Sequence, residues 1–271
     1  TGLIVVDTGT YWNAFGQTVI MILIEIGGLG FMSFTTLIAI ILGKKITLRE
    51  RLILQDAMNT FNIQGLVKMV RYVLIFTVSV QFFGALLFST QFVPEYGLGK
   101  GIFYSIFHSI SAFCNAGFDI LGKFNSLTSY NSNAVVILVA SALIIIGGLG
   151  FTVWSELYSS KSLRKVSLHS KMVILMTVVL VVGGTLLMFL FENNNINTIA
   201  DMSFIDKVMN SFFASVTPRT AGFNSIPTDG MTTAGKFLTI ILMFIGGSPG
   251  STAGGIKTTT IGILIVTIVC V

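Results

Sequence analysis

The sequence predicts an all-α polytopic membrane protein, built from repeated units that surround a pore. Three observations predict this class: the chain is strongly apolar, its apolar segments are long enough to cross a bilayer, and one glycine pattern occurs three times. Of the 271 residues, 53% are hydrophobic and only 10% are charged, whereas about a quarter of the residues in soluble domains are charged. This composition excludes an ordinary soluble domain.

Five apolar segments are long enough to cross a hydrocarbon core about 30 Å thick, which takes about 20 helical residues. They cover residues 14–42, 67–88, 134–158, 172–191 and 237–271. The two cysteines, Cys114 and Cys270, fall on opposite sides of the membrane in this topology, so we do not expect them to pair.

The charged residues sort by membrane side, although the net charge is +5. The basic residues near span ends are Lys44, Lys45, Arg49, Arg51, Lys68, Arg71, Lys161, Arg164, Lys165 and Lys171. The opposite loops carry Glu95, Glu192, Asp201, Asp206 and Asp229. Lysine and arginine near span ends mark the cytoplasmic side. Because the basic residues form no single patch interleaved with aromatics, we expect no nucleic-acid partner.

A repeated pattern organises the chain. Thr-Gly-Leu at residues 1–3, Asn-Ala-Gly-Phe at 115–118 and Thr-Ala-Gly-Phe at 220–223 are each followed by a polar loop and an apolar helix. Each of these helices then reaches a double glycine, and two of the double glycines lie in an identical Gly-Gly-Leu-Gly-Phe pentapeptide. Such self-similarity indicates an architecture of repeats.

Each complete repeat is predicted to consist of an outer helix, a short re-entrant pore helix, a tight turn and an inner helix. The predicted short helices, residues 101–113 and 203–216, have helical spacing but cannot span a bilayer. The predicted division is residues 1–66 for the end of the first repeat, 67–166 for the second and 167–271 for the third.

A pseudo-fourfold pore needs a fourth side. A carbonyl cage around one ion is normally four-sided, so we expect that this chain is a fragment. A complete protein would add an outer helix and a pore helix before residue 1 and a fourth repeat after residue 271. The alternatives are that three repeats suffice or that chains assemble.

The three turns carry the groups that can bind a dehydrated cation. Backbone carbonyls replace bound water when they converge on one axis, and glycine permits the positive φ that such a backbone requires. A helix that ends just before each turn favours a cation there, because its C-terminal end is partially negative. The predicted ion-binding residues of this selectivity filter are Thr1, Gly2, Asn115, Ala116, Gly117, Thr220, Ala221 and Gly222.

The break in the last inner helix is predicted to be a gate inside the membrane. It contains five glycines and one proline, which cost about 1 and about 3 kcal/mol per helical position. The predicted gate residues are Gly246, Gly247, Ser248, Pro249, Gly250, Ser251, Thr252, Ala253, Gly254 and Gly255. The double glycines of the other repeats lack this proline and serine, so they are predicted to be hinges or close helix contacts.

Other polar residues leave two interpretations open. Asp7, Asp119 and Asn224 follow the turns, where they either concentrate cations or are solvated loop residues. Glu25 lies inside an apolar span, either near the conduction path or in a structural hydrogen bond. Arg219 is expected to brace the third turn by bonding carbonyls.

An enzymatic function is not expected. Residues 250–258 resemble a phosphate-binding loop, but Ile256 is inserted before Lys257 and the segment follows a helix instead of a strand. The two histidines, His108 and His169, are placed too far from Ser248 to serve as its base. No cluster of Cys and His has metal-ligand spacing, so no metal is expected beyond potassium at the turns.

The motifs resemble those of the Trk/Ktr/HKT superfamily of potassium transporters, most closely the bacterial KtrB-type membrane subunits. They are Gly-Gly-Leu-Gly-Phe, Asn-Ala-Gly-Phe-Asp, Thr-Pro-Arg-Thr-Ala-Gly-Phe-Asn and Gly-Gly-Ser-Pro-Gly-Ser-Thr-Ala-Gly-Gly-Ile-Lys-Thr. The resemblance covers the whole chain. It implies a multi-pass protein of the bacterial plasma membrane, with four repeats around one pore, filter glycines at Gly2, Gly117 and Gly222 and a gate at residues 246–255.

The resemblance also implies partners. Relatives form homodimers on a cytosolic ring of KtrA-type nucleotide-binding subunits, whose ATP or ADP occupancy controls the gate. No cofactor is expected in this chain itself. In the resembling family, a serine at the first filter glycine is associated with sodium permeation, so Gly2 favours potassium. The alternatives are a sodium-selective or non-selective cation pathway, and a membrane scaffold that transports nothing.

Overall fold

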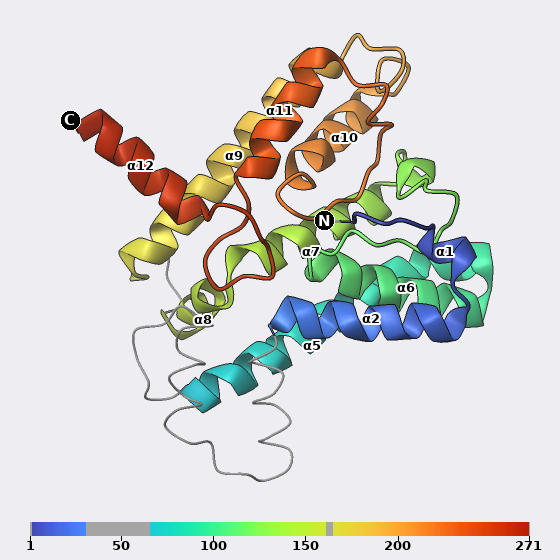
Figure 1. Ribbon diagram of the computed structural model, residues 1–271, viewed down its shortest axis with the longest axis horizontal. Coiled ribbons are helices and arrows are strands. Elements are labelled where there is room, and N and C mark those ends of the chain that lie inside the picture. Colours follow the sequence, from blue (N-terminus) through green and yellow to red (C-terminus); the bar gives the residue numbers. More distant parts are fainter. Residues whose placement is uncertain (1, 31–65, 161–164, 271) are drawn as a thin grey trace.

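The computed structural model describes residues 2–30, 66–160 and 165–270, and every regular element within these ranges is helical. The predicted all-α class is therefore confirmed (Figure 1). In chain order the helices are α1 (Thr8–Tyr11), α2 (Ala14–Leu29), α5 (Leu66–Tyr96), α6 (Leu98–Phe113), the 3₁₀ turn η1 (Thr128–Tyr130), α7 (Ala134–Leu149), α8 (Phe151–Ser160), α9 (Leu168–Glu192), α10 (Phe204–Val216), α11 (Thr233–Phe244) and α12 (Thr258–Cys270).

Two described helices are long and apolar enough to cross a membrane, residues Val70–Tyr96 of α5 and the whole of α9. A third span results if α7 and α8 are taken together, and these two helices are bent by 90° at their junction. The apolar segment at 237–271 divides into α11 and α12, because residues 246–255 interrupt it as predicted. The segment at 14–42 is described only to residue 30, and Lys44, Lys45, Arg49, Arg51, Lys161 and Arg164 lie outside the described residues.

The outer and short helices differ from their predicted bounds at their ends. The outer helix expected at 67–88 continues to Tyr96 and contains Pro94. The short helix expected at 101–113 begins at Leu98, directly after Gly97, whose φ of 80° stops the preceding helix. The helix expected at 172–191 begins at Leu168, because the side chain of Ser167 caps its first turn.

The second and third repeats pack their short helices in the same way. Ser109 on α6 donates to the carbonyl oxygen of Gln81 on α5 at 2.6 Å, and Ser215 on α10 donates to that of Val181 on α9 at 3.0 Å. Each serine faces a glycine of the outer helix; a Cβ added at Gly84 would lie 2.6 Å from Ser109 Oγ. Small residues therefore let each short helix approach its outer helix closely.

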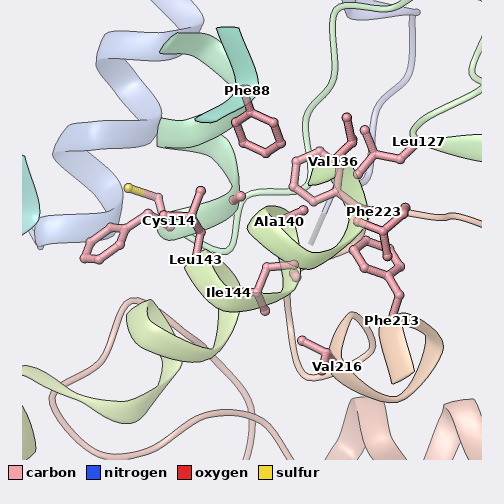
Figure 2. Packing of buried hydrophobic residues seen from close by; sticks show 14 of the residues in the cluster. Phe88, Cys114, Leu127, Val136, Ala140, Leu143, Ile144, Phe213, Val216 and Phe223 are labelled. Atoms are coloured by element: carbon pink, nitrogen blue, oxygen red, sulfur yellow. The ribbon is translucent and has the colours of Figure 1, made fainter. Parts of the chain in front are cut away.

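Helix α7 lies at the centre of the molecule, where the second and third repeats meet. It packs against α5 and α6 on one side and α10 on the other. Figure 2 shows Ala140 and Ile144 of α7 among buried side chains that include Phe88 from α5 and Phe213 from α10. This apolar contact fixes the two short helices relative to one another, and with them the turns that follow.

Glu192, the last residue of α9, joins the outer and inner helices of the third repeat. Its Oε1 accepts hydrogen bonds from the backbone N–H and the hydroxyl of Thr232, at 2.9 and 2.7 Å. Its Oε2 accepts from Asn195 at 2.7 Å and from Thr198 at 2.8 Å. Thr232 in turn caps α11. One buried carboxylate thus orients the start of the helix that leads to the predicted gate.

Replacing this carboxylate is expected to destabilise the third repeat. Hydrogen bonds to charged groups contribute about 1.5–3 kcal/mol each, and their loss leaves buried donors unpaired. Glu192→Ala is therefore expected to lower the free energy of unfolding by about 2–4 kcal/mol, measured as a lower thermal midpoint of the purified protein in detergent. Asp201→Ala, at an exposed carboxylate of the same loop, is the matched control. Equal midpoints for the two variants would contradict this role.

Candidate functional site

The three predicted turns lie side by side, although they are far apart in the sequence. Gly2, Gly117 and Gly222 have φ angles of 63°, 73° and 94°, the left-handed region that favours glycine. A Cβ added at Gly2 would lie 2.7 Å from the carbonyl oxygen of Gly117 and 3.2 Å from that of Gly222. A Cβ at Gly117 would lie 2.9 Å from Gly222 Cα. Backbone therefore meets backbone at this point, and no larger residue fits without displacing a neighbouring turn.

Side-chain hydroxyls close two of the turns from behind. Ser111 donates to the carbonyl oxygen of Phe118 at 2.6 Å, and Thr217 donates to that of Phe223 at 2.6 Å. The first turn is held by its neighbour, because Gly2 N–H donates to the carbonyl oxygen of Ala116 at 2.6 Å. That oxygen belongs to one of the residues predicted to bind the ion.

The short helices α6 and α10 each end directly before a turn, as predicted for a site where helix C-terminal ends favour a cation. Helix α6 ends at Phe113 and α10 at Val216, each immediately before its turn. Their C-terminal ends, which carry partial negative charge, therefore lie beside the three glycines. The structure brings together seven of the eight residues predicted for the filter; the remaining one, Thr1, lies outside the described residues.

The predicted gate forms a loop closed at its base. Gly246 N–H donates to the carbonyl oxygen of Ile256 at 3.1 Å, and Gly247 N–H donates to that of Gly254 at 3.2 Å. Lys257 Nζ donates to the carbonyl oxygen of Ala253 at 2.8 Å, so this lysine stabilises the loop itself. We refer to residues 246–255 as the gate loop.

The tip of the gate loop fills the break between α7 and α8. Gly148 and Gly147 at the end of α7 accept hydrogen bonds from Ser248 N–H at 3.0 Å and Thr252 N–H at 3.2 Å. At the start of α8, Phe151 N–H donates to the carbonyl oxygen of Gly250 at 2.9 Å. The break therefore provides partners for the loop, and the loop satisfies backbone groups that the 90° bend leaves open.

The gate loop also touches the filter turns. Asn115 Nδ2 donates to Thr252 Oγ1 at 2.8 Å, and this hydroxyl donates to the carbonyl oxygen of Phe113 at 2.9 Å. Gly254 N–H donates to Thr220 Oγ1 at 3.3 Å. These contacts were not predicted. Their signal in the sequence is that Asn115 and Thr220 occupy equivalent positions, each two residues before its predicted filter glycine.

A pocket of about 680 Å³ opens beside the first and third turns. Gly2, Leu3, Thr220 and Gly222 line it on the side of the turns, and α11 lines the opposite side with residues that include Thr239. Leu3 is 90% exposed. The pocket thus borders two of the three turns.

Glu25 and Arg219 have defined environments. Glu25 Oε2 accepts hydrogen bonds from Gln81 Nε2 at 2.7 Å and from Cys114 Sγ at 3.4 Å, which ties α2 to α5 and to the end of α6. These contacts match the structural interpretation of Glu25. Arg219 is buried, but its Nε has no hydrogen-bond partner among the described residues, so the expected bracing of carbonyls through this nitrogen is not observed.

Asp7 and Asp119 are both buried, so neither is a solvated loop residue. Asp7 caps α1 by accepting from Gly9 N–H at 3.1 Å, and it also accepts from the N–H of Lys123. Asp119 accepts from Leu121 N–H at 3.1 Å. Burial raises the pKa of Asp119 to about 6, and the nearby charge of Asp7 adds to this shift.

Comparison with known proteins identifies the family. The model of the TrkH family, described as "Cation transport protein", matches residues 1–270. The chain belongs to the TrkH family. Potassium/sodium uptake protein NtpJ from Enterococcus hirae is 48% identical over 98% of this chain and 58% of its own length. Ktr system potassium uptake protein B from Bacillus subtilis is 44% identical over 99% of this chain and 60% of its own length.

A solved structure has the same fold. The potassium transporter TrkH from Vibrio parahaemolyticus aligns with a TM-score of 0.69 over 97% of this chain and 50% of its own, at 18% sequence identity. As a member of the TrkH family, this chain is an integral protein of the plasma membrane. It spans about 58–60% of the length of these two curated relatives.

The raised pKa of Asp119 predicts a pH-dependent stability. The folded state binds a proton more tightly than the unfolded chain, so stability is fully present below the unfolded pKa of 3.8 and declines as pH rises through about 6. The difference corresponds to about 3 kcal/mol. Asp119→Asn, which is neutral throughout, is expected to flatten the fall in thermal midpoint between these values. Identical pH profiles for the variant and the parent protein would contradict the assignment.

Proposed function

We propose that this chain forms most of a potassium-selective uptake pore, whose filter consists of backbone carbonyls at the three glycine turns. The observation that carries the proposal is the convergence of Gly2, Gly117 and Gly222 at the ends of two short helices. Two curated relatives named for potassium or potassium/sodium uptake support this choice of cargo.

The chemistry of the turns suits a dehydrated monovalent cation. Potassium loses its hydration shell at modest cost when several carbonyl oxygens take the place of water. The proposed donors are the carbonyls of residues 115–117 and 220–222, together with those of residues 1 and 2. A single glycine per turn gives a short filter, which suggests fewer ordered ion sites than the longer filters of potassium channels.

The fourth side of the filter is proposed to come from residues outside this chain. The pocket of about 680 Å³ lies between the first and third turns, where a fourth turn would close the ring. The greater length of the relatives supports this arrangement, since each extends well beyond the matched region. The complete pore is therefore expected to be pseudo-fourfold.

The gate loop is proposed to block conduction until a regulatory partner moves it. The position of the loop between the filter turns and the α7–α8 break supports this role. Unwound backbone at membrane depth occurs only where it is buried in protein or lines a water-filled cavity, and a pore is such a cavity. By resemblance to Ktr systems, the proposed partner is a cytosolic ring that binds ATP or ADP. A homodimer of the complete subunit is proposed on the same basis.

A sodium-permeable pathway is the second candidate. The name of the Enterococcus relative, a potassium/sodium uptake protein, favours it. Both candidates use the same pore, and they differ in how strictly the carbonyl cage rejects the smaller ion. A membrane scaffold without transport would show no flux of either ion through reconstituted liposomes.

Changing the third filter glycine tests the proposed filter. A Ser side chain at Gly222 is strained by the φ of 94° and disturbs the turn, so Gly222→Ser in the full-length transporter is expected to lower the K⁺/Na⁺ uptake ratio about tenfold, or about 1.4 kcal/mol. The ratio is measured as ion uptake into liposomes. Gly183→Ser is a control, since a Cβ at Gly183 on α9 meets nothing within 4 Å. An unchanged ratio in Gly222→Ser would reject the filter.

Shortening the gate loop tests the gate. Deleting residues 247–251 removes the tip that fills the α7–α8 break, so K⁺ flux in the absence of the regulatory ring is expected to rise several-fold. The measurement is K⁺ efflux from liposomes that contain the full-length transporter, with and without a nucleotide-loaded ring. Flux that stays low and still depends on the ring would show that the barrier lies elsewhere.

A further inference from the structure

Two filter residues other than glycine hold a backbone conformation that most residues avoid. Asn115 has a φ of 52° and Thr220 a φ of 77°. Asparagine enters this left-handed region with some ease, but a β-branched residue such as threonine is a genuine outlier there. Such conformations persist only when surrounding contacts hold them. The two residues occupy equivalent positions in the second and third turns.

The gate loop supplies one such contact to each of these residues. Asn115 donates through its side-chain amide to Thr252 Oγ1 at 2.8 Å, and Thr220 Oγ1 accepts from Gly254 N–H at 3.3 Å. Thr252 and Gly254 are only two residues apart in the loop. A single short segment therefore contacts the residue of positive φ in the second turn and the one in the third turn.

Thr252 holds the second turn at two points. Its hydroxyl accepts the hydrogen bond from Asn115 and donates its proton to the carbonyl oxygen of Phe113 at 2.9 Å, so it acts as acceptor and donor at once. Phe113 is the last residue of α6, and a carbonyl at a helix C-terminus lacks a partner within the helix. Thr252 thus joins the end of the short helix to the first strained residue after it.

The backbone of Thr252 is fixed as well. Its N–H donates to the carbonyl oxygen of Gly147 at 3.2 Å, and a Cβ added at Gly147 would lie 2.9 Å from Thr252 Oγ1. Glycine at this position of α7 therefore leaves room for the hydroxyl next to Phe113. The loop, α7 and the second turn meet at this one side chain.

We propose that Thr252 is a positioning residue for the selectivity filter. Thr252 holds the second turn in shape through Asn115 and Phe113 while the gate loop occupies the α7–α8 break. Gly254 supports the third turn through Thr220 in the same way. The inference rests on the proposed function and adds to it that ion selectivity depends on a side chain of the gate. A gate loop that moves away releases both turns.

The test replaces the hydroxyl while keeping the shape of the side chain. In the full-length transporter reconstituted in liposomes, Thr252→Val is expected to lower the K⁺/Na⁺ uptake ratio about fivefold, because two hydrogen bonds are lost. Thr252→Ser retains the hydroxyl and is expected to restore the ratio. Total K⁺ flux is recorded in the same samples, so a change in gating is separated from a change in selectivity.

A matched control isolates the effect. Thr267→Val makes the same chemical change on α12, where the hydroxyl bonds to the carbonyl oxygen of Ile263 in its own helix at 2.8 Å. It is expected to leave both quantities at the parent value.

A second variant keeps the proposal testable if Thr252→Val fails to assemble. Asn115→Gly removes the amide but accepts positive φ without strain, so in this background Thr252→Ala is expected to change the ratio less than it does in the parent protein. A ratio that changes equally in both backgrounds would overturn the proposal. If Thr252→Val keeps the parental ratio while Gly222→Ser lowers it, the role of Thr252 is overturned and the proposed filter stands. If both variants keep the parental ratio, the proposed filter itself is rejected.

Discussion

Backbone groups that no regular helix satisfies must find partners inside the bilayer, and the site is built around this constraint. The 90° bend between α7 and α8 frees the carbonyls of Gly147 and Gly148 and the N–H of Phe151. The gate loop, which is itself unwound, bonds to all three. Two interrupted helices from different repeats thus stabilise one another, and neither interruption is favourable alone. The gate loop, which moves in the proposed mechanism, is thereby held against the α7–α8 break.

Close approach of backbones is the second requirement, and glycine provides it. Gly84 leaves room for Ser109, and Gly28 leaves room for Cys114, whose Sγ would lie 2.5 Å from a Cβ at that position. Gly147 does the same for Thr252. These contacts pull the short helix α6 toward α5 and α2 and bring the gate loop against the end of α6. Association in lipid lacks a hydrophobic driving force, so such packing and the hydrogen bonds it permits hold the repeats together.

The proposed filter depends on these two requirements, hydrogen-bond partners for unwound backbone and close backbone approach at glycine. Two short helices are anchored through serines to their outer helices, and both end at the same place, so their turns converge. The turns themselves are held by hydroxyls of Ser111 and Thr217 behind them and by the gate loop beneath. Rigidity at a carbonyl cage matters because selectivity depends on the number and placement of its oxygens. In the proposed arrangement the gate loop contributes to that rigidity.

The class of protein, the approximate positions of the helices and the glycines at the turns could be predicted from the sequence, because these depend on composition and on local backbone preferences. Helix ends at Tyr96 and Leu98 differed from expectation, since apolar length alone does not show where a cap lies. Which polar side chains meet could not be predicted in this way. Asn115 and Thr252 are 137 residues apart, and no local sequence pattern predicts a contact that depends on how α5, α6 and α10 pack against α7.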